Sequence, residues 1–304
     1  MKTIVTGGAG FIGSNIVDRL ITDGNDVIVI DNESSDAHEK FYYNGSAQYH
    51  KNDIADYDSV ESLFEGVDYV FHLAAEARIQ PTIEDPMLAV RTNVLGTCSV
   101  LQASRTHGVK RVVYSSTSSA YGLSNPIPNK EDMPKDCLNP YSVSKTSGEE
   151  LCQMYTKLFG LETVVFRYFN VYGERQPTKG QYAPVIGLFQ RQHAAGKLMT
   201  VVGDGLQRRD FTHVSDVVEA NILAATTDNS NVLGEIFNLG SGTNHNIHDI
   251  VNLVGGKDAK FTYIPERPGE SRETLSDCSK AHKLLKWKPK MKLEEWITSC
   301  KQLA

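Results

Sequence analysis

The chain has 304 residues, of which 40% are hydrophobic and 22% are charged, and its formal net charge is −6. This composition is typical of a globular protein with enough length for one large domain or two unequal ones. No block of like charge stands out, which argues against nucleic acid or an anionic membrane surface as the partner.

The five cysteines are scattered along the chain, at Cys98, Cys137, Cys152, Cys278 and Cys300. No pair has the spacing of a metal site or of a redox motif, so we expect free thiols in a reducing compartment and no metal. No apolar run approaches the roughly 20 residues that a membrane span needs. Glycines interrupt the apolar start in a way that is wrong for a signal peptide. We therefore expect a cytoplasmic protein.

Strand-like and helix-like segments alternate through the first 170 residues. Apolar runs predict strands within 3–6, 26–31, 48–54, 67–75, 111–117 and 162–170. Amphipathic stretches predict helices within 14–24, 58–66, 87–108 and 141–160. This alternation predicts an α/β fold with a doubly wound parallel sheet of the Rossmann type.

The regular alternation of strand-like and helix-like segments stops at about Val171. Prolines and glycines interrupt the sequence there, and the later predicted elements are shorter. We expect residues 1–170 to form the sheet domain and residues 171–304 to form a smaller domain. The run "EIFNLGSG" at 235–242 is a further strand candidate that could rejoin the large sheet, so the two predicted domains are partly interleaved.

The stretch "VTGGAGFIGSN" places Gly7, Gly10 and Gly13 between the first predicted strand and the first predicted helix. Glycines at this spacing permit a tight turn, a close backbone approach to a pyrophosphate and close packing of helix on strand. The free N–H groups of the helix N-terminus then face the phosphates. The alternative is a tight turn without a ligand.

"DVIVID" ends in Asp31, at the tip of the second predicted strand. A carboxylate there accepts hydrogen bonds from the adenosine ribose hydroxyls and repels a 2′-phosphate, so we expect NAD rather than NADP. The alternative is a turn former at a strand end. Asp53, after the third predicted strand, is a weaker candidate for contact with the adenine. Phe11, Ile12, Asn32 and Ile54, beside these positions, complete this part of the predicted cofactor site.

"NPYSVSKTSGEEL" sets Tyr141 and Lys145 four residues apart at a predicted helix start, on one helical face. A tyrosine is a poor base at neutral pH, but a neighbouring ammonium or a cationic nicotinamide ring favours its phenolate. The pair could therefore act as a general base, with the lysine also holding a ribose. Taken alone, the pattern favours an ordinary helix start with a solvated lysine.

These features occur in a fixed order, together with a row of hydroxyls, "SSTSSAYG", at a later strand tip. In this combination the sequence resembles the extended short-chain dehydrogenase/reductase family, specifically its nucleotide-sugar epimerases and dehydratases. The resemblance spans nearly the whole chain. It includes "TGGAGFIGSN", "HLAAEA", "TNVLGT", "YSVSK", "RYFNVYG", "GDGLQRRDFTHVSDV" and "RPGESRETLSD".

The resemblance implies that Thr117 hydrogen-bonds the sugar's 4-hydroxyl, that Tyr141 takes its proton and that Lys145 assists. It implies a cofactor wall made of Leu73, Ala74, Ala75, Asn93, Ser115 and Tyr168. It also implies that Asn170, Arg209 and Arg267 contact the nucleotide diphosphate, and that Gln207 and Glu270 face the uridine ribose. Arginine forks suit diphosphate oxygens.

Carboxylates are missing from "SSTSSAYG". Related dehydratases carry Asp-Glu directly after the catalytic threonine, and related decarboxylases carry a glutamate two positions after it. Ser118 and Ser119 stand there instead and cannot titrate near neutral pH. The remaining Tyr/Lys/Thr set can oxidise C4 and reduce it again, so the resemblance implies 4-epimerisation. The role of Glu76 in "HLAAEA" stays open at this stage.

We therefore expect an NAD-dependent UDP-sugar 4-epimerase that interconverts UDP-glucose and UDP-galactose. The alternatives are 4-epimerases of UDP-N-acetylglucosamine or UDP-glucuronate, a nucleotide-sugar reductase and a non-catalytic NAD or nucleotide-sugar sensor. Thr274 stands near a position where some relatives carry a bulky tyrosine, and a threonine leaves room for an N-acetyl group. The family also implies a homodimer through the helices within 88–107 and 141–159.

Overall fold

The computed structural model describes residues 1–178 and 183–302. Its centre is a seven-stranded sheet with the strand order β11-β6-β5-β4-β1-β2-β3, in which every neighbouring pair is parallel. The strands are β1 (Lys2–Thr6), β2 (Asp26–Ile30), β3 (Gln48–His50), β4 (Tyr69–His72), β5 (Arg111–Thr117), β6 (Glu162–Tyr168) and β11 (Glu235–Leu239). The predicted fold class, a doubly wound parallel sheet, is confirmed.

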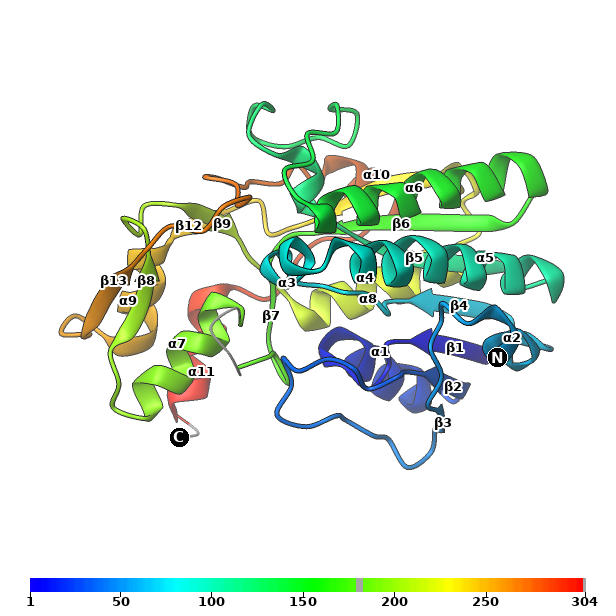
Figure 1. The fold of residues 1–304 in the computed structure, drawn as a ribbon, viewed down its shortest axis with the longest axis horizontal. Coiled ribbons are helices and arrows are strands. Elements are labelled where there is room, and N and C mark those ends of the chain that lie inside the picture. Colours follow the sequence, from blue (N-terminus) through cyan, green and yellow to red (C-terminus); the bar gives the residue numbers. More distant parts are fainter. Residues whose placement is uncertain (179–182, 303–304) are drawn as a thin grey trace.

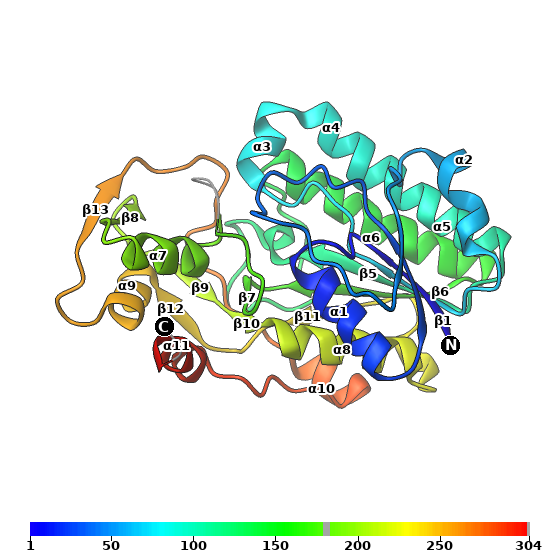
Figure 2. The ribbon, with the colours of Figure 1, turned by 90° about the horizontal axis from the view of Figure 1, so that it is seen from below.

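Helices cover both faces of this sheet, as Figures 1 and 2 show. One face carries α1 (Phe11–Thr22), α8 (Val214–Thr226) and α10 (Ser279–Leu285). The other carries α2 (Tyr57–Val60), α5 (Gly96–Thr106) and α6 (Pro140–Phe159), with α3 (Ile79–Glu84) and α4 (Pro86–Val90) packed on α6. A π-helical turn, Arg91–Leu95, connects α4 to α5.

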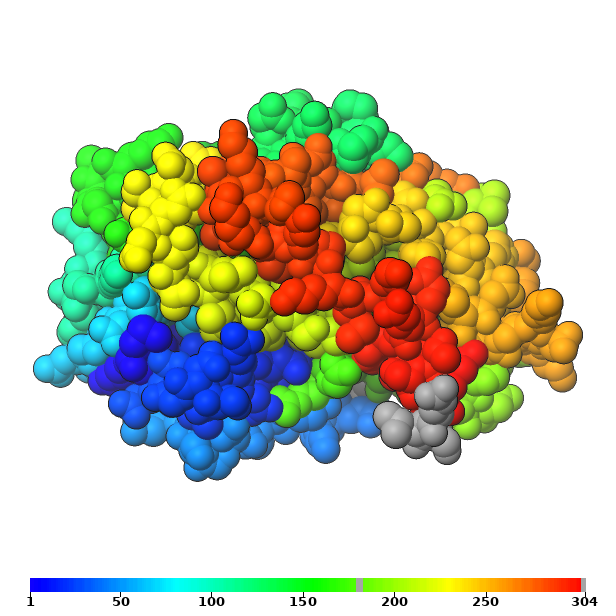
Figure 3. Space-filling model, turned by 180° about the vertical axis from the view of Figure 1, so that it is seen from behind, coloured from blue at the N-terminus to red at the C-terminus, as the bar shows by residue number. Residues whose placement is uncertain are grey.

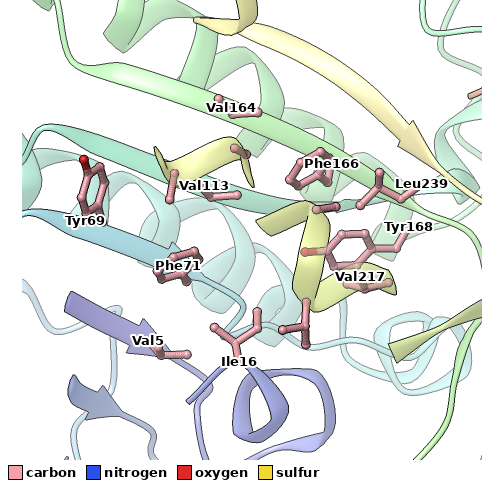
Figure 4. Packing of buried hydrophobic residues seen from close by; sticks show 14 of the residues in the cluster. Val5, Ile16, Tyr69, Phe71, Val113, Val164, Phe166, Tyr168, Val217 and Leu239 are labelled. Carbon is pink, nitrogen blue, oxygen red and sulfur yellow. The ribbon is translucent and has the colours of Figure 1, made fainter. Parts of the chain in front are cut away.

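Alternating side chains of the strands pack into two separate hydrophobic cores, one on each face of the sheet. Ile4 packs on the α5 and α6 side, whereas its neighbour Val5 packs on the α1 and α8 side. Val112 and Val113 divide between the two faces in the same way, because successive side chains of a strand point to opposite faces. Figure 4 shows the core on the α1 and α8 side, where Val5, Ile16, Phe166 and Val217 come together.

A smaller unit lies at one end of the sheet (Figure 1). It contains α7 (Val185–Ala194), α9 (Ile247–Gly255) and α11 (Leu293–Gln302), with β8 (Met199–Val202) paired to β13 (Phe261–Ile264) and β9 (Arg208–Asp210) paired to β12 (Asn244–Asn246). Its core includes Tyr172, Phe189, Phe211 and Trp296.

The chain passes between the two units more than once. The pair β7 (Val171–Tyr172) and β10 (Thr212–His213) lies between them in Figure 2. After β10, the chain returns to the large sheet as α8 and β11. Figure 3 shows the back of the molecule, where the yellow to red segments after residue 214 lie across both units. No helix within the described residues is long and apolar enough to cross a membrane.

Candidate functional site

A cavity of about 560 Å³ opens where the carboxyl ends of the sheet strands face the smaller unit. β1 and β4 are adjacent, and the chain winds outward from them in opposite directions. In open parallel sheets, ligands bind at the carboxyl ends of the strands at such a switch point. Both units contribute to the lining, so a ligand in this cavity would contact them together.

The glycine turn forms one wall of this cavity. Gly7 has φ +69°, and a Cβ on Gly13 would stand 2.2 Å from the Gly7 carbonyl oxygen, so neither position accepts a side chain. Gly10 differs, because a Cβ there would meet only the Gly7 oxygen at 3.4 Å and His38 Nε2 at 3.5 Å. Gly10 is also the N-cap of α1, and as a glycine it has no side chain that could cap the first N–H groups. The space over Gly10 and the first N–H groups of α1 therefore suits a phosphate.

Asp31 follows β2 and lines the same cavity. Its Oδ2 accepts a hydrogen bond from the Ala9 backbone N–H at 3.0 Å, and its Oδ1 accepts one from the Glu33 N–H at 2.8 Å. Burial raises the pKa of Asp31, and these two hydrogen bonds oppose the rise. The carboxylate is thus fixed at the strand tip beside the glycine turn, as the sequence predicted for a ribose acceptor.

The opposite wall comes from β4, β5 and β6. Thr6 Oγ1 accepts hydrogen bonds from the backbone N–H groups of Leu73 and Ala74, which holds the start of the "LAA" loop against β1. Ser115 and Tyr168 hold each other through their hydroxyls at 3.0 Å. Most of the predicted cofactor residues line the cavity, namely Gly7, Gly10, Phe11, Ile12, Gly13, Asp31, Asn32, Ile54, Leu73, Ala74, Ala75, Ser115, Tyr141, Lys145 and Tyr168.

Two predicted cofactor residues lie outside the cavity lining. Asp53 pairs with Arg91, while the residues on either side of it, Asn52 and Ile54, line the cavity. Asn93 is buried behind the wall. Its Oδ1 accepts from the Glu76 N–H at 2.8 Å, and its Nδ2 donates to the Glu76 carbonyl at 3.1 Å. Asn93 therefore fixes the loop that presents Glu76.

The catalytic candidates converge at the tip of β5. Thr117 ends β5 and caps the following 3-10 turn, Ser118–Tyr121, by accepting the Ser119 N–H at 3.1 Å. Asn139 and Ser142 form a capping box that starts α6 and so places Tyr141 in its first turn. Thr117 is the polar side chain that favours ionisation of the Tyr141 hydroxyl. Lys145, one turn further along α6, is 3% exposed. All three residues line the cavity.

Burial controls the electrostatics of this group. It raises the pKa of Tyr141, and Thr117 only opposes that rise. It lowers the pKa of Lys145 from 10.5 to about 7. Burial outweighs the opposing effect of Thr117 on Tyr141, because an ionised phenolate loses its hydration. The expectation that Lys145 favours the phenolate stays a prediction.

The predicted substrate residues line the far half of the cavity, toward the smaller unit. Glu270 lies between two arginines, 3.7 Å from Arg209 Nη2 and 3.9 Å from Arg267 Nη1. Asn170, at φ +32°, donates to the Asp210 carbonyl at 2.7 Å. Gln207 donates through Nε2 to Val202, while its buried Oε1 has no partner among the described residues.

Sequence reasoning missed several cavity residues that come from the segments between the two units. The buried Tyr172 hydroxyl and Gln176 Oε1 both lack a hydrogen-bond partner within residues 1–178 and 183–302. Gln80, at the start of α3, donates to the Pro268 carbonyl at 3.0 Å and so joins the large unit to the loop that carries Glu270. The "RYFNVYG" motif was the available signal for Tyr172, whereas nothing in the sequence marks the contact of Gln80.

Glu76 and Thr274 also line the cavity. Burial raises the pKa of Glu76, and its carboxylate accepts no hydrogen bond from the described residues. Thr274 is 7% exposed, and its Oγ1 accepts from the Asp210 N–H at 3.2 Å and from Asn170 Nδ2 at 3.4 Å. The small side chain of Thr274 is therefore held by hydrogen bonds at the wall of the substrate half.

A glycine turn, a strand-tip acid and a buried Tyr/Lys/Thr group in one cavity define the class of enzymes that bind a nicotinamide dinucleotide on a Rossmann fold. The model of the NAD dependent epimerase/dehydratase family matches residues 3–240. The chain belongs to this family, and it is an NAD-dependent enzyme.

Similar proteins extend over the whole chain. A putative UDP-glucose 4-epimerase of Methanocaldococcus jannaschii is 38% identical over 299 residues, which are 97% of this chain and 95% of that protein. The structure of UDP-glucose 4-epimerase from Thermotoga maritima with UDP-glucose has a TM-score of 0.92 at 35% identity and covers 100% of both chains. UDP-N-acetylglucosamine 4-epimerase from Methanobrevibacter ruminantium, in complex with UDP-N-acetylmuramic acid, has a TM-score of 0.89 at 35% identity, covering 97% of this chain and 95% of that one.

Proposed function

We propose that the protein is a UDP-sugar 4-epimerase that interconverts UDP-glucose and UDP-galactose. The observation that carries the proposal is the convergence of Thr117, Tyr141 and Lys145 at one strand tip of the cavity. Similarity to UDP-glucose 4-epimerases over the full chain supports the choice of sugar nucleotide.

The residues fit NAD. Gly10 and the start of α1 would hold the pyrophosphate, and Asp31 would hold the adenosine ribose. Lys145 would hold the second ribose. Bound NAD supplies the hydride acceptor for sugar C4, the donor that returns the hydride, and a cationic ring that favours the Tyr141 phenolate.

The residues of the chain then divide the proton chemistry. Tyr141 removes the proton of the 4-hydroxyl as C4 becomes a carbonyl, and Thr117 shares that hydrogen bond. Lys145 in its cationic form holds the phenolate. After the 4-keto sugar has turned its other face to the cofactor, Tyr141 returns the proton to the oxygen on C4. The configuration at C4 is then inverted, with no net consumption of cofactor.

The nucleotide would lie across the two units. Arg209 and Arg267 match the diphosphate, and displacement of Glu270 from its loose ion pairs would let it face the uridine ribose. The unpaired Oε1 of Gln207 offers a further acceptor in the same half of the cavity. With the diphosphate held there, the sugar could rotate without leaving the site.

The acids of the cavity wall favour epimerisation over dehydration. Asp31, Glu76 and Glu270 are the carboxylates among the described lining residues. Asp31 belongs to the cofactor half, and Glu270 pairs with the two arginines. Ser118 and Ser119 occupy the positions beside Thr117, so the acids that related dehydratases carry there are missing. Glu76 is the one carboxylate of the described lining that has neither of these two assignments.

Thr274 favours a second substrate, UDP-N-acetylglucosamine, because its small side chain leaves room at the cavity wall. The test of both proposals is turnover of a panel of UDP-glucose, UDP-N-acetylglucosamine and UDP-glucuronate by the purified enzyme. We expect 4-epimers of the first two and no net change in nicotinamide absorbance. Loss of water from the sugar, or stoichiometric oxidation of NADH, would assign a different reaction.

We also propose a homodimer. The surface of α4, the π-helical turn and α6 carries exposed apolar side chains. They are Met87, Val90, Leu95, Val143, Met154 and Leu158, with exposed fractions between 37% and 78%. Apolar helix faces of this kind are typical of an interface between subunits.

A further inference from the structure

A buried ion pair lies directly behind the catalytic group. Glu149 on α6 and Arg167 on β6 meet in a two-pronged contact, with Nε–Oε1 at 2.9 Å and Nη2–Oε2 at 2.8 Å. Their side chains are 0% and 2% exposed. The desolvation of such a pair often cancels its attraction, so its presence in a core is weak evidence for a stabilising role.

Glu149 contacts the site from two directions. Ser116 Oγ donates to Glu149 Oε1 at 2.6 Å, and Ser116 lines the cavity beside Thr117. On α6, Glu149 lies one turn after Lys145 and two turns after Tyr141, so the three residues share one helical face. The same carboxylate thus touches the hydroxyl row and stands beside the lysine.

Lys145 has few groups that favour its charged form. Its Nζ lies 4.4 Å from the centre of the Tyr114 ring on β5. His72 on β4 is neutral, because burial lowers its pKa to about 3. On α6, the neighbours are Tyr141, Cys152 and Glu149. Burial raises the pKa values of Tyr141 and Cys152, so both are neutral near pH 7. Glu149 is therefore the anion that faces Lys145 among the described residues.

Two cations in turn limit the influence of Glu149. Arg167 makes the contact described above, and Lys135 Nζ lies 3.3 Å from Glu149 Oε2. Hydrogen bonds from Arg167 and Ser116, with the charges of Arg167 and Lys135, hold the pKa of Glu149 below its usual value despite burial. The carboxylate is therefore ionised throughout the working pH range.

We propose that Glu149 is a positioning residue of the catalytic site, whose carboxylate keeps Lys145 cationic and holds Ser116 of the hydroxyl row in one orientation. The inference rests on the proposed function, because it assigns to Lys145 a task that needs its charge. Glu149 itself touches neither substrate nor cofactor.

The charge of Glu149 has a measurable consequence. A unit charge one helical turn away in a protein interior changes a pKa by about one unit or more. Loss of the anion makes Lys145 lose its proton at lower pH, and loss of an opposing cation does the reverse. The high-pH limb of kcat, which reports the enzyme–substrate complex, should move in the same directions.

The test is the pH profile of kcat for Glu149→Gln and Lys135→Gln, beside the unsubstituted enzyme. Glu149→Gln should move the high-pH limb down by about one pH unit, which is about tenfold lower kcat at a given pH on that limb, with bound NAD unchanged. Lys135→Gln, a change at a residue near the surface, should move the limb slightly upward. A purely structural role would lower kcat at every pH without moving the limb.

An unmoved limb in Glu149→Gln, or a downward shift in Lys135→Gln, would overturn the proposal. If Glu149→Gln does not fold, Lys135→Gln decides by the direction of its shift. Tyr141→Phe, measured in parallel, distinguishes failure of the proposed function from failure of the role of Glu149. Full activity of Tyr141→Phe would contradict the proposed function itself.

Discussion

The carboxylate of Asp31 accepts a hydrogen bond from the backbone N–H of Ala9, with 3.0 Å between Oδ2 and the nitrogen. This bond ties the tip of β2 to the glycine turn and leaves the acid at the cavity wall. A fixed negative charge there favours a ribose with free hydroxyls and disfavours a 2′-phosphate.

Asp31→Ala should therefore weaken NAD binding and reduce the preference for NAD over NADP. Hydrogen bonds to charged groups contribute about 1.5–3 kcal/mol, which corresponds to roughly 10–150-fold in affinity. Calorimetry with NAD and with NADP measures both affinities and so the change in preference. Glu33→Ala is the matched control, since Glu33 pairs with Tyr43 and Lys51 instead and should leave the preference unchanged. Tighter binding of NADP by the unsubstituted protein would contradict this assignment.

The proposed acceptance of UDP-N-acetylglucosamine rests on the small side chain of Thr274. Thr274→Tyr should lower kcat/KM for UDP-N-acetylglucosamine at least tenfold more than for UDP-glucose, because the ring would take the space of the N-acetyl group. Even one methylene in a pocket changes discrimination by about 10–200-fold. Thr274→Ser keeps the hydroxyl that Asp210 and Asn170 contact and should retain both substrates. If Thr274→Tyr affects both substrates equally, the size limit lies elsewhere.

The proposed dimer makes a simple mass prediction. Light scattering at micromolar concentration should give twice the chain mass of 33.6 kDa. Leu95→Glu combined with Met154→Glu should produce monomers, because two charges would enter the apolar helix face. Leu198→Glu adds a charge at another exposed apolar residue, outside these helices, and should leave the mass unchanged. A monomer mass for the unsubstituted protein would refute the dimer.

Acid should destabilise the protein through His72. Thr6 Oγ1, which accepts from two backbone N–H groups, donates its own hydrogen to Nδ1, and Nε2 donates to Thr97. The neutral ring thus has a hydrogen-bond partner at each nitrogen, and burial lowers the pKa of His72 to about 3.

In the unfolded chain, His72 binds a proton near its usual pKa of 6.5. The contribution of neutral His72 to stability is therefore fully present above that pH and is lost as the pH falls toward 3. From pH 7.5 to 5.5, the free energy of unfolding should fall by about 1.4 kcal/mol from this residue. Denaturant titrations at the two pH values measure it, and His72→Gln should lack this part of the change. An equal pH dependence in His72→Gln would assign the effect to other groups.

Much of the site follows from sequence because strand tips of a parallel sheet meet at one edge. That rule brings Gly10, Asp31 and Thr117 together without knowledge of the side-chain packing. The division into domains after residue 170 stays a prediction.

The features of the site that the sequence did not predict depend on contacts between residues far apart in the chain. The partner of Asp53 is Arg91, 38 residues away, and the ion pair behind Ser116 joins α6 to β6. The sign of the Tyr141 shift was also not predictable, because the depth of burial decides it. A glutamate one turn after the lysine of a Tyr-x-x-x-Lys helix was the available signal for Glu149.

The central claim is that hydride leaves sugar C4 and returns to it while Tyr141 moves the proton. The measurement is a single turnover of UDP-glucose deuterated at C4, with the position of the label read by mass spectrometry and NMR. We expect deuterium to remain at C4 of UDP-galactose and NADH to appear only transiently. Tyr141→Phe, which lacks the base, should be slower by at least roughly 10²-fold. Loss of the label to solvent, or near-native turnover by Tyr141→Phe, would contradict the account.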